Sequence, residues 1–158
     1  YANEVCLKYL MNRYDYLFQS KSEFYPALAD GHAMKDYSSY QVKDIEFQTY
    51  DVVHGHEKTT GFRFADVGYT LDFKKFSAPE KAINMRKGIK TWIVDCGGLL
   101  FENNPVHASL GIIQDLNASI GAERVILSSL SSYIDYERET IGLPDGYELA
   151  YDGLSFRN

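Results

Sequence analysis

Asp95 is the residue whose position first suggests chemistry. It ends the apolar run Trp92-Ile93-Val94 and is followed closely by the pair Gly97-Gly98, in the string TWIVDCGGLL. In open α/β sheets, ligands bind beyond the carboxyl ends of the strands. A buried strand that ends in a carboxylate and then turns on glycine presents that carboxylate where a nucleophile or metal ligand belongs. Asp95 is therefore the first candidate site residue.

Ser128 and Ser129 form a second candidate cluster, at the end of the apolar run ERVILSSL (123–130). If both runs are parallel strands, their carboxyl ends lie at one edge of the sheet, and the serines lie near Asp95. Hydroxyl and backbone N–H groups near a helix N-terminus can hold a phosphate. The same serines can instead cap the helix that follows them. The sequence leaves both interpretations open.

Two further groups of residues contain histidine. His54-Gly55-His56-Glu57 offers two imidazoles and a carboxylate, which are zinc-type ligands. A solvated turn between two strands is the simpler interpretation, and we favour it. Asp95, Cys96 and His107 could pair a thiol with a base. A turn and the start of a helix separate Cys96 from His107, so we expect no contact between them.

The elements of the first half are predicted from hydrophobic spacing. Apolar residues three and four apart predict an amphipathic helix over 3–20. Alternating and aromatic-rich runs predict extended strands over 40–53 and 61–73. A helix is predicted over 76–88, because Ser77 can cap it, Pro79 suits its first turn and Gly88 ends it.

The second half shows a more regular alternation of elements. Continuous apolar runs predict strands over 89–100 and 123–130, of the kind that is buried on both faces of a parallel sheet. Helices are predicted over 105–121 and 132–142, and a last strand with a possible hairpin over 147–158. This is a βαβαβ unit, which requires right-handed crossovers between parallel strands. The predicted fold class is α/β.

Composition excludes several classes of partner. The chain carries 22 acidic and 16 basic residues, a net charge of −6, which disfavours binding to nucleic acid. No apolar run reaches the roughly 18 residues that span a bilayer, so we expect no membrane segment. Cys6 and Cys96 match no zinc or redox spacing, which predicts reduced thiols and a cytoplasmic protein, with a single disulfide as the alternative. The chain begins with Tyr1 and is expected to be processed or part of a longer protein.

The order of several short motifs resembles a known family. FKKFS (73–77), TWIVDCGGLL, VILSSLS (125–131) and GLPDGYELAYDGLSFR (142–157) resemble the phosphatase-like domain of the trehalose-6-phosphate synthase/phosphatase family, within the haloacid dehalogenase-like (HAD) superfamily. The resemblance covers roughly residues 62–158. It implies a HAD-like parallel sheet with flanking helices over 76–158, truncated before the family's later motifs. Residues 1–75 are then an N-terminal helix and strand segment that the family does not place.

The resemblance also implies what the site residues do. Asp95 stands at the position of the family's nucleophile, and Gly97 at that of its general acid. Glycine cannot carry a proton, and the loss of proton transfer costs a factor of about 10²–10⁴ in rate. Both positions are therefore read as vestigial, with no catalytic residue. Asp95 alone is a poor Mg²⁺ site, so no metal or cofactor is expected. What remains is a ligand- or phosphate-binding set: Asp95, Gly98, Ser128 and Ser129.

The function implied is a non-catalytic regulatory or structural module, a pseudophosphatase in trehalose biosynthesis. Its expected partners are other subunits or domains of a trehalose-synthesising complex, and its expected ligand is a sugar phosphate. One alternative is an active sugar-phosphate phosphatase that uses Mg²⁺, with Asp95 as a metal ligand. Another is a small α+β cone-like binding domain, in which 40–53, 61–73 and 89–100 pair antiparallel. The string GLPDGYE alone suggests a flavin-binding fold. Parallel pairing of 89–97 with 123–129 would exclude the cone-like alternative.

Overall fold

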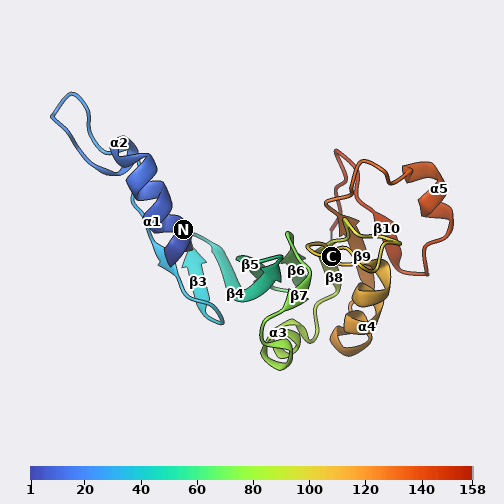
Figure 1. Ribbon diagram of the computed structural model, residues 1–158. Coiled ribbons are helices and arrows are strands. Elements are labelled where there is room, and N and C mark those ends of the chain that lie inside the picture. The colour runs from blue at the N-terminus through green and yellow to red at the C-terminus, as the bar shows by residue number, and fades with distance from the viewer. Residues whose placement is uncertain (158) are drawn as a thin grey trace.

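An eight-stranded β-sheet organises the chain in the computed structural model, which describes residues 1–157 (Figure 1). Its strand order is β10-β9-β8-β6-β5-β4-β3, and β7 also pairs with β4. A separate two-stranded sheet joins β1 and β2. The expected mixed α/β class is confirmed. The strands are β1 (Ala2–Asn3), β2 (Ala33–Met34), β3 (Ser39–Val42), β4 (Ile45–His54), β5 (Glu57–Phe64), β6 (Val67–Thr70), β7 (Lys75–Phe76), β8 (Thr91–Asp95), β9 (Arg124–Ser128) and β10 (Tyr147–Leu149).

The parallel half of the sheet follows the predicted βαβαβ order. Strand β8 lies between β6 and β9 and is parallel to both, with Asp95 in register with Ser128. Helices α4 (Leu110–Ile120) and α5 (Tyr136–Ile141) connect β8, β9 and β10. The expected shared edge of Asp95 and Ser128 is confirmed. The cone-like alternative is wrong, because it required antiparallel pairing of 89–100.

The antiparallel half consists of two hairpins where the sequence predicted two single strands. The run 40–53 contains the turn between β3 and β4, and the run 61–73 contains the turn between β5 and β6. Lys43 and Ala65 adopt a left-handed backbone in these turns, with φ of 53° and 48°. Turns of this kind usually carry glycine or asparagine, so the usual sequence signal is absent here. Strand β4 is antiparallel to β5, and β5 is antiparallel to β6, so β4 points in the same direction as β6 and β8.

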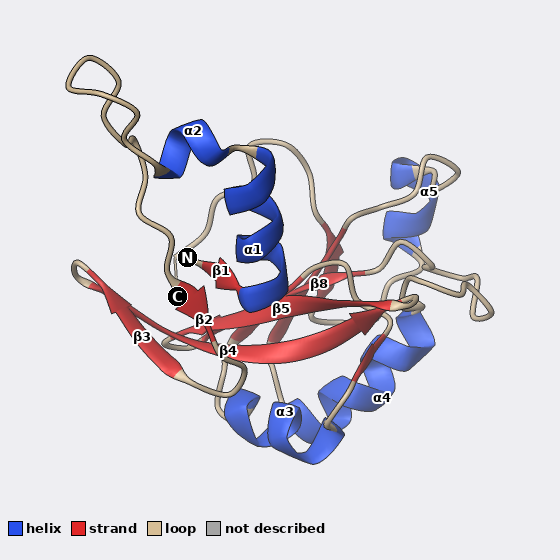
Figure 2. Ribbon diagram, turned by 60° about the vertical axis from the view of Figure 1, so that its left-hand side comes forward, coloured by secondary structure: helices blue, strands red, loops and turns tan. Residues whose placement is uncertain are grey.

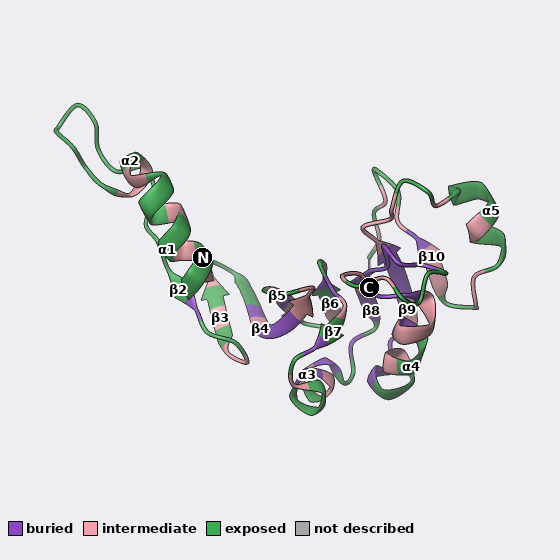
Figure 3. Ribbon diagram, viewed as in Figure 1, coloured by how far each residue is buried: buried purple, intermediate pink, exposed green. Residues whose placement is uncertain are grey.

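The core lies between the sheet and the helices α3 (Pro79–Arg86) and α4, which cover one of its faces (Figure 2). The side chains of the central strands on this face are fully buried: Trp92, Val94, Val125 and Leu127. Figure 3 shows the same concentration of buried residues in β8 and β9. These side chains fix β8 and β9 in place, and with them the position of the sheet edge.

The N-terminal residues form an arm that projects from one end of the main sheet (Figure 1), while its base contacts β3 through the rings of Tyr1 and Tyr40. The helix predicted over 3–20 is divided into α1 (Glu4–Arg13) and α2 (Asp15–Phe18). Tyr14 interrupts it with a non-helical backbone of φ −125° and ψ 46°. No residue of 1–33 is buried. The first buried side chain is that of Met34.

Three further expectations concern the termini and the division of the chain. The expected hairpin over 147–158 is not formed by the described residues, where β10 is followed by turns. Strands on both sides of the expected boundary at residues 75 and 76 share one sheet, and the division into 1–75 and 76–158 stays a prediction. No helix within residues 1–157 has the length and apolarity to cross a bilayer.

Candidate metal centre

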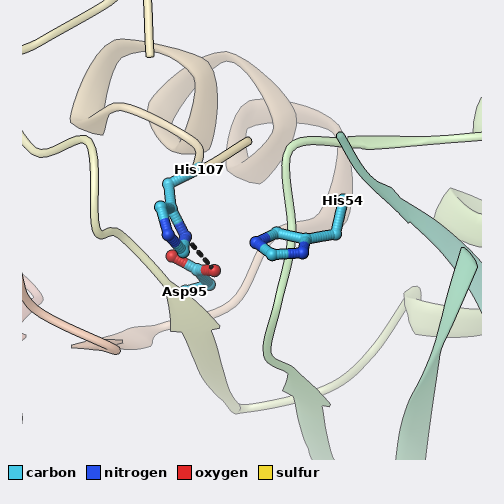
Figure 4. A group of neighbouring side chains, drawn as sticks. All are labelled: His54, Asp95 and His107. Atoms are coloured by element: carbon cyan, nitrogen blue, oxygen red, sulfur yellow. Dashed lines mark hydrogen bonds and ion pairs between the residues drawn. The ribbon is translucent and has the colours of Figure 1, made fainter. Parts of the chain in front are cut away.

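Three side chains that are distant in sequence converge at the carboxyl edge of the sheet (Figure 4). His54 is the last residue of β4, Asp95 is the last residue of β8, and His107 lies in the loop before α4. One potential ligand atom from each of them lies within 4.8 Å of the other two. The two imidazole centroids are 5.0 Å apart. This is the edge at which the sequence placed Asp95 and Ser128.

Asp95 is fully buried and makes three hydrogen bonds. Its Oδ1 accepts from the backbone N–H of Gly97 at 2.8 Å, and its Oδ2 accepts from that of Phe73 at 2.9 Å. Oδ2 also lies 2.8 Å from Nδ1 of His107. An ionised carboxylate can only accept, so Nδ1 is the donor and the lone pair of a neutral His107 is on Nε2. Carboxylates orient metal-binding histidines in the same manner.

The backbone around His107 is fixed on both sides. The side-chain oxygen of Asn104 accepts from the N–H groups of Val106 and His107, at 3.0 and 2.9 Å. Ala108 donates to the carbonyl of Phe73 at 2.8 Å. The predicted helix start at Pro105 is therefore wrong. Helix α4 begins only at Leu110, after the N-cap Ser109.

The glycine pair after Asp95 has a packing explanation. A Cβ atom on Gly97 would lie 2.8 Å from Cγ of His107 and 2.9 Å from the carbonyl oxygen of Ser129. A Cβ on Gly98 would lie 2.6 Å from the carbonyl oxygen of Ala108. All three distances are shorter than the contacts that real Cβ atoms make. Glycine at these positions lets the loop that carries His107 approach the tip of β8.

His54 contributes an imidazole nitrogen with no partner. Its Nε2 is shielded from solvent and makes no hydrogen bond to any described residue. Buried polar atoms are nearly always hydrogen-bonded, so an isolated one calls for an explanation. Gly55 turns the chain with a φ of 61°, and His56 and Glu57 are exposed. The string HGHE therefore contains one residue of the candidate centre, His54, whereas His56 and Glu57 are not part of it.

The donor set suits a divalent transition metal ion. Imidazoles are ligands of zinc and of related ions, and a carboxylate such as Asp95 orients them. Catalytic zinc sites have three protein ligands and leave one position open for water or substrate, so His54 and His107 supply part of such a ligand set. The unpartnered Nε2 of His54, opposite an imidazole whose Nε2 lone pair is free, is the feature that fits such an ion. The residues present are thus compatible with a metal centre of the catalytic type.

The predicted phosphate-binding serines lie beside this centre and line a different depression. Ser128 is half-buried, and its carbonyl accepts from the N–H of Cys96 at 2.8 Å. Ser129 has a left-handed backbone with φ of 54°. Both line a shallow pocket of about 300 Å³ that also contains Asp152 and has no basic side chain. The phosphate-binding role of Gly98, Ser128 and Ser129 stays a prediction.

Cys96 is part of the hydrophobic core. It is fully buried, and burial raises the pKa of its thiol to about 12. His107 is hydrogen-bonded to Asp95. The expectation that Cys96 and His107 form no catalytic pair agrees with these contacts. Sequence reasoning missed that His107 and His54 are instead neighbours of Asp95, because only the strand directions bring them together.

Comparison with known proteins identifies the class of fold. No family profile matches the chain. A curated relative, an octanoyltransferase of Porphyromonas gingivalis, is 24% identical over 156 residues, which are 98% of this chain and 31% of the relative. A solved diphosphatase of the PhnP family matches 98% of this chain and 55% of its own, with a TM-score of 0.81 and 24% identity.

Two further solved structures show the same architecture. The metallo-β-lactamase fold protein YhfI of Bacillus subtilis matches 91% of this chain and 60% of its own, with a TM-score of 0.67 and 11% identity. The short form of human tRNase Z matches 73% of this chain and 44% of its own, with a TM-score of 0.56 and 11% identity. The fold is that of the metallo-β-lactamase class. The chain spans less than two thirds of each of these proteins.

This finding corrects the family resemblance. The HAD-like sheet and the trehalose-6-phosphate synthase/phosphatase assignment are wrong, because the similar structures are metallo-β-lactamase-fold proteins. The regulatory pseudophosphatase role in trehalose biosynthesis is wrong for the same reason. The motifs misled because a strand ending in aspartate and glycine, beside a second strand ending in serine, occurs in this fold as well.

Proposed function

We propose that this chain supplies part of the catalytic centre of a metal-dependent hydrolase that cleaves phosphate-ester or diphosphate bonds. The observation that carries the proposal is the buried, unpartnered Nε2 of His54, which faces an imidazole oriented by Asp95. The substrate class is supported by the fold, since the similar structures include a diphosphatase and a tRNase.

Each residue of the centre has a distinct role in the proposal. Asp95 holds the proton on Nδ1 of His107, so that Nε2 of His107 can bind a metal ion together with Nε2 of His54. Gly97 provides the space in which the His107 ring lies. A divalent ion held there would polarise a phosphoryl oxygen and lower the pKa of bound water. The histidines and Asp95 position the ion at the open edge of the sheet.

Acyl transfer is the alternative raised by the octanoyltransferase relative, and the site does not favour it. The chain spans 31% of that protein, whose name describes the whole. A thiol that carries an acyl group must first form a thiolate. Burial raises the pKa of Cys96 to about 12, so this thiol stays protonated at neutral pH. Cys6, the other thiol, is on the arm.

Metal binding by the purified chain is the primary test. After chelation, Zn²⁺ and Mn²⁺ are titrated by calorimetry, and the bound metal is counted by elemental analysis. We expect about one ion per chain, and loss of binding in His54→Ala and His107→Ala. His56→Ala is the matched control. Because His56 is exposed in the same turn, this variant should bind the metal ion as the wild type does.

The reaction class is tested separately with the metal-loaded protein and bis(4-nitrophenyl) phosphate. Release of 4-nitrophenol that requires the metal and both histidines supports the hydrolase. If the wild type binds no ion, or if His56→Ala is as defective as His54→Ala, the metal centre is rejected. If the ion binds and neither the diester nor a nucleoside diphosphate is cleaved, the proposed substrate class is rejected.

A further inference from the structure

An apolar pocket lies at the carboxyl edge of the sheet, on the loops that follow β8 and β9. It has a volume of about 270 Å³, and its apolar lining consists of Leu99, Leu100, Phe101, Tyr133 and Ile134. Three of these side chains, Leu100, Phe101 and Tyr133, are 69%, 57% and 59% exposed. Large apolar side chains that are exposed together usually mark a binding surface. This site is called the loop pocket below.

Gly97 joins the loop pocket to the candidate metal centre. Its carbonyl oxygen accepts from the hydroxyl groups of Ser131 and Tyr133, both at 2.7 Å. Its N–H donates to Asp95, and a Cβ on it would lie 2.8 Å from Cγ of His107. One side of this residue therefore contacts the lining of the pocket, and the other contacts the centre. The loop pocket and the metal centre are neighbours at the same edge of the sheet.

The backbone at the base of the loop pocket is held in a strained conformation. Leu99 has a φ of 33°, outside the regions that a leucine favours. Its N–H donates to the carbonyl of Cys96 at 2.9 Å, and its carbonyl accepts from the N–H of Leu110 at 2.8 Å. Strained residues that their surroundings hold in place cluster at binding and active sites. The strain at Leu99 is thus a second indication that this pocket binds a ligand.

The lining favours an uncharged aromatic group over an anion. Within residues 1–157, the charged side chains that line the pocket are Arg138 and Glu139. Nε and Nη2 of Arg138 both donate to Oε1 of Glu139, at 2.8 and 2.5 Å, so this pair leaves the pocket neutral. Phe101 and Tyr133 supply rings against which another ring packs favourably. An apolar cavity of roughly 150 Å³ binds benzene, so the volume is sufficient for one aromatic ring.

We propose that the loop pocket is a subsite for the aromatic group of a phosphate-ester substrate whose phosphoryl group lies at the metal centre. The inference rests on the proposed function, and it adds the chemistry of the group that the phosphoryl group carries. Phe101 and Tyr133 contact the ring. No bond is formed or broken in the pocket, whose contribution is to orient the ester.

Phenylphosphonate and methylphosphonate test the subsite on the zinc-loaded chain. Both carry a phosphonate group for the metal, and only the first carries a ring. Calorimetry should show that phenylphosphonate binds at least about 10-fold more tightly, because the pocket removes the ring from water. Phe101→Ala should reduce this preference to no more than about twofold and leave zinc binding unchanged. Phe24→Ala is the matched control, because Phe24 is 89% exposed on the arm and should not affect the preference.

2-Naphthol tests the pocket without the metal. It is uncharged at pH 7 and can bind only through its rings and hydroxyl group, and its fluorescence measures binding to the metal-free chain. We expect binding by the wild type and by Phe24→Ala, and its loss in Phe101→Ala. Binding that survives Phe101→Ala, or that is lost in Phe24→Ala, overturns the inference.

The remaining outcomes separate the pocket from the metal centre. Equal affinities of the zinc-loaded wild type for the two phosphonates overturn the inference and leave the proposed centre standing. Loss of both phosphonates in Arg138→Ala, with zinc still bound, would indicate an anion site and overturn the inference as well. An absence of zinc binding by the wild type overturns the proposed function, and with it the role of the pocket as a subsite.

Discussion

Replacing Gly97 with alanine adds one methyl group where the structure leaves no space for it. The new Cβ would lie 2.8 Å from Cγ of His107 and 2.9 Å from the backbone carbonyl oxygen of Ser129. The backbone yields less readily than a side chain, so the imidazole must move and its hydrogen bond to Asp95 is lost. Overpacking costs about 1–3 kcal/mol, and a hydrogen bond to a charged group contributes about 1.5–3 kcal/mol. Because the two effects overlap, we expect a loss of about 2–4 kcal/mol.

The assay combines urea unfolding with a zinc titration. Besides the loss of stability, the affinity of Gly97→Ala for zinc should fall by about 10–100-fold, the usual effect of disturbing a residue that orients a ligand. Gly142→Ala is the matched control, because no atom lies within 4 Å of its Cβ position and its φ is −95°. It should stay within about 0.5 kcal/mol of the wild type. Wild-type stability and zinc affinity in Gly97→Ala would refute the packing explanation.

Gly97→Asp extends the same test to the corrected family resemblance. In that interpretation the variant would restore a general acid at position 97 and produce phosphatase activity. The structure requires the opposite result, because a carboxylate at position 97 meets the same atoms as the methyl group and adds a negative charge beside Asp95. We expect Gly97→Asp to be less stable than Gly97→Ala and to show no gain in phosphate release from trehalose-6-phosphate.

Three further predictions concern the hydrogen bonds that hold the centre and the adjoining hairpin. Asp95→Asn should weaken zinc binding by about 10–100-fold in calorimetry, because the amide no longer fixes the proton on Nδ1 of His107. Asn104→Ala should lower the free energy of unfolding by about 1–2 kcal/mol, because two N–H groups lose their acceptor, whereas Asn104→Asp should retain most of it. Burial, together with a hydrogen bond to Asp51, raises the pKa of Tyr37 from 10.0 to about 12. Its contribution to stability is therefore complete below pH 10 and is lost as pH rises towards 12, an effect that Tyr37→Phe should remove in urea titrations at several pH values.

The parallel half of the fold was predictable because its signals are local and strong. The apolar runs around Val94 and Leu127 are long enough to be strands buried on both faces. Helix α4 shows an apolar stripe that ends at Gly121, whose φ of 79° forms the expected C-cap. Together they require adjacent parallel strands, and the structure confirms that pairing. These segments alone predict the α/β class, but they do not predict the metallo-β-lactamase fold.

The antiparallel half and the arm were less predictable for physical reasons. The hairpin turns at Lys43 and Ala65 use left-handed residues without glycine, so the apolar alternation continues through them. The break at Tyr14 has no proline or glycine to mark it. The contact of His54 with the other site residues depends on β4 pointing in the same direction as β8, which is known only once the turns between β4 and β5 and between β5 and β6 are both recognised. The sequence therefore predicted the position of Asp95, but not its contacts with His54 and His107.

The chemical role of a carboxylate at the end of a strand depends on the groups that surround it. The parallel pairing of β8 and β9 was confirmed, yet it did not separate a HAD-like sheet from a metallo-β-lactamase fold, because the pairing satisfies both. The comparison with solved structures separates them. The contacts of Asp95, which are two backbone N–H groups and the Nδ1 of His107, agree with that outcome. These contacts hold the carboxylate in place, and the one with Nδ1 leaves the lone pair of a neutral His107 on Nε2. The geometry of Asp95 is that of a residue that positions a ligand, and the chemistry of the site is accordingly expected at the two imidazoles.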